Sequence, residues 1–363
     1  VLARVTRKNP WSRNPACAVM LALSALLPAY SHPSSVCAVG DLHGDLQHAL
    51  AALALCGAVD PETGSWVGGA MTVVQTGDVL DRGNNSLGVL RALWRLQAEA
   101  EAAGGELVLL LGNHELMNMQ GKVHYVHKAE LAAEGGAGAW KRRMQPTVGD
   151  LGAALLRHDA AAVRGGGACR TLFVHAGVRL SVAERFGSVE RLNEAVRAQI
   201  AARGDGDLLD PREGPLWWRG YARPRQAFRR EEQACTEVQA ALGALDPSAR
   251  RMAVGHNIVP WVSSRCGGTL ALLDVGMSSA YGGLPAAWRC DVGEEGEART
   301  AALYYHGAAT RGPVRSVSPP PELCDACSRF TPAGGGGDRA EAARQENAAH
   351  DCHEYCPPER MEL

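Results

Sequence analysis

The chain has 363 residues, of which 46% are hydrophobic and 21% charged, and its formal net charge is −2. This composition is typical of a globular protein that buries a sizeable core in one large domain or two smaller ones. A nucleic-acid-binding protein would normally carry a basic patch or stripe. The near-neutral balance gives no reason to expect a nucleic-acid partner.

Residues 1–35 differ from the rest of the chain. The first forty residues contain no Asp or Glu and four basic residues, and an apolar run lies at residues 16–29. That run is too short to predict a transmembrane helix, so we expect no stable membrane span. A basic start, a short apolar run and Ser/Pro-rich residues indicate a targeting segment, with an ordinary N-terminal extension as the alternative. We expect targeting to a chloroplast or mitochondrion, or else entry into the secretory pathway.

Short apolar runs recur between residues 36 and 317, and each ends in a turn that carries polar residues. Such runs lie at 36–39, 71–75, 106–111, 171–174, 251–254 and 269–273. Continuous apolar runs with β-branched residues are typical of buried strands, and apolar spacing predicts a helix at 87–103. The pattern predicts a layered α/β domain over residues 36–317. Its polar side chains gather at the carboxyl ends of strands, where ligand sites of α/β sheets form.

Two longer stretches, residues 117–164 and 179–249, interrupt this alternation and consist mostly of helix-forming residues with charged faces. We expect them to form a helical cap that shapes access to the site. Three consecutive prolines at 319–321 mark a boundary. Residues 318–363 are rich in Gly, Ala and charged residues without a strand pattern, and we expect a low-complexity tail.

The chain contains eleven cysteines, and four of them lie in the tail as a C-x-x-C and a C-x-x-x-C: Cys324, Cys327, Cys352 and Cys356. Two disulfides, a structural zinc site and free thiols are all consistent with these spacings. The other seven are scattered, and we expect most of them to be small hydrophobic residues of the core. They are Cys17, Cys37, Cys56, Cys169, Cys235, Cys266 and Cys290.

Residues that can ligate metals follow the predicted strands directly: Asp41, His43, Asp78, Asn113, His175 and His256. Two divalent ions held close together need carboxylates, imidazoles and an amide, with at least one carboxylate shared. Glycines in the same turns allow the tight bends that would hold such side chains rigidly. Each residue alone is more commonly an ordinary turn residue. Together, at successive strand ends, they predict a two-metal centre.

The turns also contain recognisable motifs. Residues 40–44 (GDLHG), 77–83 (GDVLDRG) and 112–115 (GNHE) resemble the three signature motifs of the PPP-type phosphoprotein phosphatases, in that family's order. Residues 175–177 and 255–256 resemble its two later metal-histidine motifs. The closer similarity is to the Shewanella-like branch, carried by the segments 111–119, 214–220, 274–278 and 281–282. This resemblance covers residues 36–283 with insertions, and it implies the calcineurin-like metallophosphoesterase fold.

The resemblance also implies a role for each matching residue. Two divalent ions would be ligated by Asp41 and His43 at the first, by Asp78 at both, and by Asn113, His175 and His256 at the second. A hydroxide bridging the ions would attack phosphorus, and His114, oriented by Asp81, would protonate the leaving oxygen. Arg82, Arg219 and Asn113 would bind the phosphate. Mixed nitrogen and oxygen ligands suit manganese, iron or zinc alike.

The expected function is therefore phosphoester hydrolysis, with a phosphoprotein or phosphopeptide as substrate. The alternative is a small-molecule phosphoesterase, such as a hydrolase of bis-nucleoside polyphosphates, because related folds with the same motifs perform that chemistry. A catalytically inactive scaffold would lack a ligand or the general acid, and the sequence keeps all of them. Glu115 ends a signature motif and serves either the chemistry or a structural hydrogen bond.

Overall fold

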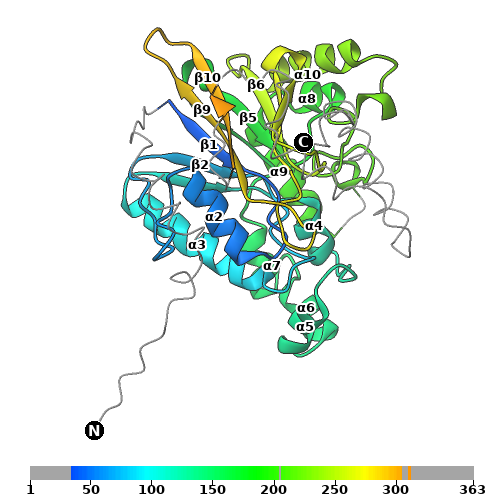
Figure 1. Cartoon of the computed structure of the whole chain (residues 1–363). Coiled ribbons are helices and arrows are strands. Elements are labelled where there is room, and N and C mark those ends of the chain that lie inside the picture. Colours follow the sequence, from blue (N-terminus) through cyan, green and yellow to red (C-terminus); the bar gives the residue numbers. More distant parts are fainter. Residues whose placement is uncertain (1–33, 204–205, 305–309, 312–363) are drawn as a thin grey trace, which may run out of the picture.

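The computed structural model describes residues 34–203, 206–304 and 310–311, which form two β-sheets flanked by helices (Figure 1). The predicted targeting segment, apart from its last two residues, and the predicted tail with its four cysteines lie outside the described residues. Within the described part, no helix has both the length and the apolar character needed to cross a membrane.

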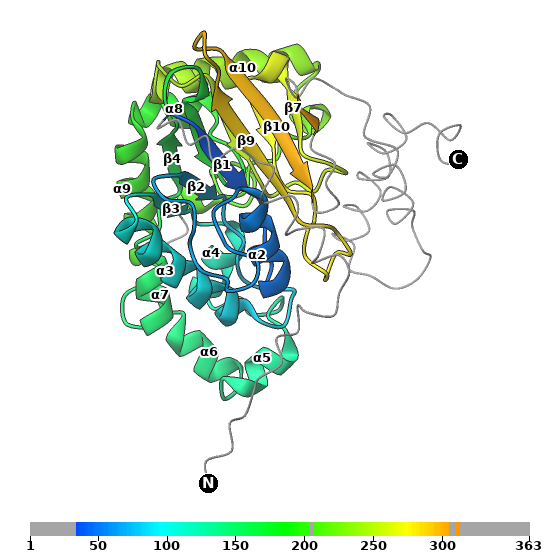
Figure 2. The same cartoon turned by 60° about the vertical axis from the view of Figure 1, so that its left-hand side comes forward.

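The first sheet has the strand order β11-β10-β9-β1-β2-β3. Its strands are β1 (Val36–Val39), β2 (Thr72–Gln75), β3 (Glu106–Leu109), β9 (Ala286–Val292), β10 (Ala298–Tyr304) and β11 (Thr310–Arg311). β1, β2 and β3 are parallel, whereas β9 pairs antiparallel with β1. The crossovers between the parallel strands contain α2 (Leu46–Leu55) and α3 (Ser86–Ala102). Figure 2 shows both of these helices beside β1 and β2.

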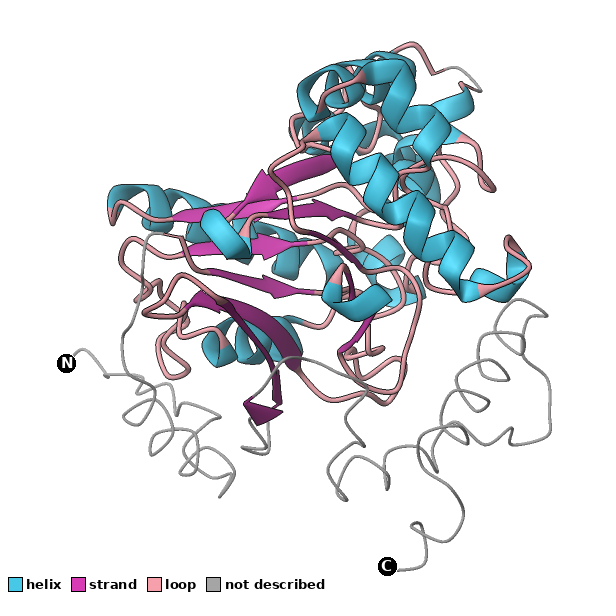
Figure 3. Cartoon of the chain, turned by 90° about the horizontal axis from the view of Figure 1, so that it is seen from above, coloured by secondary structure: helices cyan, strands magenta, loops and turns pink. Residues whose placement is uncertain are grey.

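The second sheet has the order β4-β5-β6-β8-β7. Its strands are β4 (Ala161–Arg164), β5 (Thr171–Val174), β6 (Arg251–Val254), β7 (Ser263–Arg265) and β8 (Leu270–Leu272). β5, β6 and β8 are parallel, and the strands of both sheets lie between helices (Figure 3). Every residue of β1, β5 and β6 is buried, which explains why these strands read as continuous apolar runs.

Of the remaining α-helices, the first follows β3 directly, and the others belong to the two stretches that interrupt the strand pattern. They are α4 (Asn113–Met119), α5 (Lys128–Ala133), α6 (Ala137–Arg143), α7 (Asp150–Leu155), α8 (Leu180–Phe186), α9 (Val189–Ala201) and α10 (Glu231–Leu245). In Figures 1 and 2, α5 and α6 lie at one end of the molecule, and α8 and α10 lie at the other.

The predicted layered α/β fold is confirmed. All six predicted strands and the helix predicted at 87–103 are present, with ends shifted by up to two residues. The sequence did not reveal β4, which lies inside a stretch expected to be helical, nor β7 and the β9–β11 meander. These strands lie at sheet edges or are partly exposed, so their sequences lack a continuous apolar run.

Most of the seven scattered cysteines are buried in the core, as predicted, although the prediction did not foresee that they are paired. Six of them form three disulfides: Cys37–Cys56, Cys169–Cys290 and Cys235–Cys266. The first joins β1 to the end of α2, the second joins the two sheets, and the third joins α10 to the segment before β8. The partners lie 19 to 121 residues apart, so no local spacing indicates them. Cys17 lies outside the described residues.

Candidate metal centre and active site

The predicted ligands lie together at the carboxyl ends of strands from both sheets. They follow β1 (Asp41, His43), β2 (Asp78), β3 (Asn113), β5 (His175) and β6 (His256). All of them are buried, with at most 6% of any residue exposed. The packing of the two sheets therefore gathers residues from 41 to 256 into one cluster.

The turns that carry these side chains depart from ordinary backbone conformations. His43, Asp78 and His256 have φ angles of 43°, 56° and 64°, in the left-handed region that is costly for residues other than glycine. A Cβ added at Gly77 would lie 2.5 Å from the backbone nitrogen of Gly112, so these two turns approach this closely only because residue 77 is glycine. Backbone strain of this kind clusters at functional sites.

Two groups of potential metal ligands share Asp78. One contains His43 and His114, the other contains His175 and His256, and within each group the donor atoms lie within 4.8 Å of one another. Asp78 Oδ2 is 3.7 Å from His43 Nε2, whereas Asp78 Oδ1 is 3.3 Å from His175 Nε2. The two carboxylate oxygens thus face different imidazoles, as a ligand shared by two ions requires.

Asp41 and Asn113 extend the two groups on opposite sides. Asp41 Oδ2 lies 3.9 Å from His43 Nε2, and Asn113 Oδ1 lies 2.9 Å from His175 Nε2. The resemblance to the phosphatase family implies the same division between two ions. His114 also lies beside the first group, with its Nε2 3.9 Å from Asp78 Oδ2, although the resemblance does not make it a ligand.

Backbone carbonyls fix the orientation of the imidazoles. The Nδ1 atoms of His43 and His175 lie 3.1 and 2.9 Å from the carbonyl oxygens of Leu80 and Thr76. A ring nitrogen that donates to a carbonyl leaves the other nitrogen unprotonated in a neutral imidazole, and that nitrogen can bind a metal. His256 is oriented the other way, with Nε2 3.2 Å from the carbonyl oxygen of Trp217.

The electrostatics of the cluster favour cation binding. Burial, followed by the charge of His114, lowers the pKa of His43 from 6.5 to about 3, which keeps its ring in the neutral form that ligates metals. Burial alone would raise the pKa of Asp78. The imidazoles of His175 and His114 outweigh that effect and hold the pKa well below its usual value.

A further buried carboxylate, Asp274, lies against Asp41. Burial, Asp274 and Asp78 raise the pKa of Asp41 well above its usual value. Burying several carboxylates together is unfavourable unless cations compensate them. The buried carboxylates, the oriented imidazoles and the amide of Asn113 therefore fit two divalent ions. The sequence motifs did not assign Asp274 a role, although it follows β8 in a strand-end turn like the predicted ligands.

His114 and Asp81 form a buried pair beside this cluster. His114 Nδ1 lies 2.6 Å from Asp81 Oδ2, and at most 2% of either side chain is exposed. An Nδ1–H that donates to the carboxylate fixes the ring and leaves Nε2 directed toward Asp78. The pair therefore has the geometry of a general acid and the residue that orients it.

Glu115 has a structural role at this site. Its carboxylate accepts hydrogen bonds from the backbone N–H groups of Gly112, Asp78, Val79 and Leu80, at 2.8 to 3.0 Å. It is 1% exposed and lies in the first turn of α4. Glu115 thus ties the turn after β2 to the turn after β3, which resolves the two alternatives left by the sequence in favour of a structural hydrogen bond.

The two arginines expected to bind phosphate are held in different ways. The guanidinium of Arg82 lies 3.9 Å above the ring of Tyr125 and 5.8 Å from the ring of Tyr281, and its backbone N–H donates to the carbonyl of Tyr125. Arg219 Nη1 donates to the carbonyl oxygen of His256, at 3.1 Å, and to Asn257 Oδ1, at 3.0 Å. The sequence motifs did not single out Tyr125 or Asn257.

The fold and this cluster define a metal-dependent phosphoester hydrolase. Residues 34–237 match the family model of the calcineurin-like phosphoesterases, and the chain belongs to that family. It is 34% identical over 265 residues to an uncharacterized protein of Schizosaccharomyces pombe, covering 71% of this chain and 77% of that protein. It is 31% identical over 305 residues to Shewanella-like protein phosphatase 2 of Arabidopsis thaliana, covering 70% of this chain and 75% of that protein.

A solved structure shares the fold. The cold-active protein-tyrosine phosphatase of a psychrophilic Shewanella superposes with a TM-score of 0.61 at 23% sequence identity, covering 78% of this chain and 80% of that chain. The predicted resemblance to PPP-type phosphatases, and to their Shewanella-like branch, is confirmed by these comparisons.

Proposed function

We propose that the protein is a phosphoprotein phosphatase with two divalent ions at Asp41, His43, Asp78, Asn113, His175 and His256. The observation that carries this proposal is the buried His114–Asp81 pair beside Asp78, the carboxylate that both ligand groups share. When bound, the two ions supply an activated water and neutralise charge on the phosphate. Manganese, iron and zinc all suit this set of carboxylate, imidazole and amide donors.

The side chains of this chain perform the remaining tasks. His114 would donate a proton from Nε2 to the departing oxygen, while Asp81 holds Nδ1. Arg82 and Arg219 would each direct guanidinium N–H groups at the phosphate oxygens, a planar geometry that suits them. With its oxygen toward a metal, the amide nitrogen of Asn113 would be available to the same phosphate.

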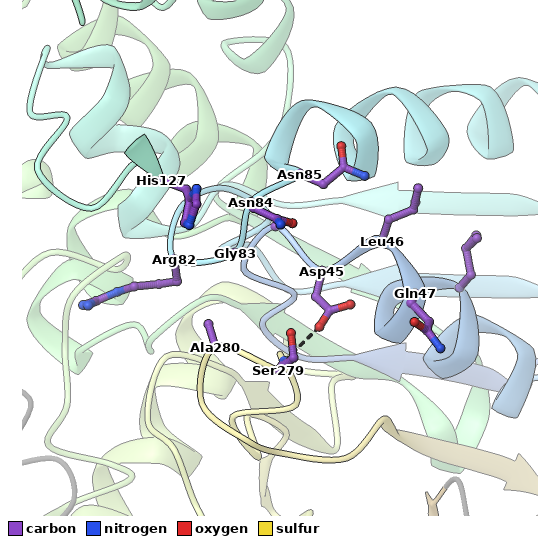
Figure 4. Close-up of a pocket in the computed structure, with 12 residues that line it drawn as sticks. Asp45, Leu46, Gln47, Arg82, Gly83, Asn84, Asn85, His127, Ser279 and Ala280 are labelled. Atoms are coloured by element: carbon purple, nitrogen blue, oxygen red, sulfur yellow. Dashed lines mark hydrogen bonds between the residues drawn. The ribbon is translucent and has the colours of Figure 1, made fainter. Parts of the chain in front are cut away.

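A pocket next to Arg82 supports a substrate larger than a bare phosphate. It has a volume of about 680 Å³. Figure 4 shows polar side chains around it from the turns after β1 and β2, from the start of α2 and from the loop before β9. Its lining residues are Gly44, Asp45, Leu46, Gln47, Leu50, Arg82, Gly83, Asn84, Asn85, His127, Ser279 and Ala280.

The chemistry of this lining favours a peptide over a dinucleotide. Hydrogen-bonding groups such as those of Gln47, Asn84 and Asn85 can pair with peptide groups that flank a phosphorylated residue. Tyr125 and Tyr281 flank Arg82 but do not line this pocket, so the pocket itself offers no Phe, Tyr or Trp for a nucleobase to stack on. The relatives named as protein phosphatases also support this choice.

The proposal is tested by assaying the purified, manganese-loaded protein on peptides that contain phosphoserine, phosphothreonine or phosphotyrosine, and on diadenosine tetraphosphate. We expect kcat/KM to be at least ten times higher for one of the phosphopeptides. A higher value for diadenosine tetraphosphate would refute a protein substrate and support the alternative. Variants of Asn84 or Gln47 should raise KM for the peptide and leave p-nitrophenyl phosphate hydrolysis unchanged.

We also propose that the catalytic domain folds in an oxidising compartment, with the secretory pathway favoured over a chloroplast stroma or mitochondrial matrix. The three disulfides support this, because such bonds persist in oxidising compartments and are rare in reducing ones. Imaging of the natural full-length protein fused to a fluorescent protein tests the location. A stromal or matrix signal would contradict it.

A further inference from the structure

We propose that Asn118 and Trp140 form a positioning chain that fixes the carboxylate of Asp81 and, through it, the imidazole of His114. This inference rests on the proposed role of His114 as the general acid. Neither Asn118 nor Trp140 faces the substrate, so each acts through Asp81 as a positioning residue.

The chain starts at the second oxygen of Asp81. Oδ2 contacts His114, whereas Oδ1 accepts a hydrogen bond from Asn118 Nδ2 at 2.9 Å. The torsion that turns an Asp carboxylate is broad, so one hydrogen bond leaves the plane of the carboxylate loosely defined. A second bond on the opposite oxygen fixes that plane, and thereby the direction in which Oδ2 meets His114.

Asn118 is anchored to the helix that carries the general acid. It lies four residues after His114 in α4, and side chains with this spacing share one face of a helix. Its Nδ2 also donates to the carbonyl oxygen of His114 at 2.9 Å. Asn118 is fully buried, so water does not compete for these bonds.

Trp140 determines which way the amide of Asn118 points. Trp140 Nε1 donates to Asn118 Oδ1 at 2.6 Å. An indole N–H can only donate, so the oxygen of Asn118 must face Trp140 and its NH2 group must face Asp81. A flipped amide would place its oxygen against Asp81 Oδ1 and its NH2 against the indole N–H, and both contacts would be repulsive.

The position of Trp140 connects this chain of hydrogen bonds to the helical insertion, residues 117–164. Trp140 is fully buried in α6, within the stretch that interrupts the strand pattern. The neighbouring α5 contacts the start of α3, where Glu130 Oε1 accepts from the backbone N–H of Leu87 at 2.8 Å. In the same turn of α3, Ser86 Oγ accepts from the backbone N–H of Asp81 at 3.1 Å. The insertion therefore supports the proton donor, apart from any influence on substrate access.

This arrangement predicts a specific defect. If the chain positions a proton donor, its loss should slow release of a leaving group that needs a proton and should spare one that does not. A general loss of fold or metal would slow both equally. Phenyl phosphate and p-nitrophenyl phosphate provide this contrast, because phenolate leaves poorly without a proton and nitrophenolate leaves readily. Neither substrate requires that the natural substrate be a protein.

The experiment measures kcat on both substrates, and bound metal, for Asn118→Ala and Trp140→Phe. We expect Asn118→Ala to slow phenyl phosphate hydrolysis about 10–100-fold, part of the roughly 10²–10⁴-fold contribution of a general acid. Trp140→Phe, which keeps the ring packing and removes only the N–H, should slow it about 3–10-fold. Losses on p-nitrophenyl phosphate should stay below about 3-fold, with metal content unchanged.

Trp66→Phe is the matched control. It removes the indole N–H of another buried tryptophan, which donates to the carbonyl oxygen of Gly69 at 3.1 Å and belongs to no part of the site. It should change neither substrate's kcat. If Asn118→Ala does not fold, the comparison of Trp140→Phe with Trp66→Phe on the two substrates still tests the positioning role.

A double variant separates the possible failures. In a His114→Asn background, Asn118→Ala should cause no further loss on phenyl phosphate, because its effect passes through His114. Additive losses, or equal losses on both substrates, would overturn the positioning chain and leave the proposed function intact. If His114→Asn itself lowered kcat equally on both substrates, the general-acid role of His114 would be refuted, and with it the proposed mechanism.

Discussion

Removing the disulfide between the two sheets gives a sharp test of the fold. Cys169, before β5, and Cys290, in β9, are separated by 121 residues, with the Cys235–Cys266 bridge inside that loop. Closing a loop of this length lowers the conformational entropy of the unfolded chain. On the chain-entropy estimate, this raises the unfolding free energy by about 4–5 kcal/mol at 25 °C. The Cys37–Cys56 loop spans 19 residues, and the same estimate gives about 3 kcal/mol.

We therefore expect the Cys169→Ala/Cys290→Ala protein to lose about 4–5 kcal/mol of unfolding free energy, more than the Cys37→Ala/Cys56→Ala protein loses. Urea unfolding followed by the fluorescence of the eight tryptophans measures both values. Below the unfolding transition, hydrolysis of p-nitrophenyl phosphate should continue, because neither Cys169 nor Cys290 contacts a ligand residue directly.

Two results would refute this reasoning. One is labelling of Cys169 and Cys290 by iodoacetamide in the oxidised, denatured protein, since paired cysteines do not react. The other is a loss below about 1 kcal/mol in the Cys169→Ala/Cys290→Ala protein, with an unchanged urea dependence, which would show that the bridge does not constrain the unfolded chain.

Four further predictions concern single residues. Asp78→Asn should lose bound metal and nearly all activity while the chain still folds, and wild-type turnover with full metal occupancy would contradict the shared-ligand role. His114→Asn should slow hydrolysis of a phosphoserine peptide by roughly 10²–10⁴-fold and hydrolysis of p-nitrophenyl phosphate much less. Its metal content should equal that of the wild type, and a loss of metal would instead make His114 a ligand. Glu115→Gln should lower the unfolding free energy by about 2–3 kcal/mol and also weaken metal binding, because the amide cannot accept all four backbone hydrogen bonds. Calorimetry measures the stability and metal analysis the binding. Unchanged stability would show that these hydrogen bonds are dispensable. Burial lowers the pKa of His158 from 6.5 to about 4, so the folded protein holds this imidazole in its neutral form. The contribution of His158 to the unfolding free energy is therefore complete above pH 6.5 and is lost as the pH falls toward 4. Between pH 7 and 5 the wild type should therefore lose up to about 2 kcal/mol more unfolding free energy than His158→Gln. Equal losses in urea titrations would count against a neutral, half-buried His158.

Much of the site was predictable because its candidate ligands belong to local motifs. A short buried strand followed by a glycine-rich turn is recognisable within a few residues, as at Val36 to Gly44, and parallel strands place such turns at one edge of a sheet. The sequence thus determined the α/β class and the residues that meet at the cluster. The resemblance to a phosphatase family added an expected role for each of them.

Only the tertiary structure determined which distant side chains pair. The disulfide partners, the contact of Asp274 with Asp41, and the link from Trp140 through Asn118 to Asp81 join segments from different elements. A cysteine, an asparagine or a tryptophan has the same local sequence signature whether it is paired or only packed in the core. Which partner it meets depends on how the sheets and the helical insertion pack, and that packing is set by long-range burial of apolar surface across the whole domain.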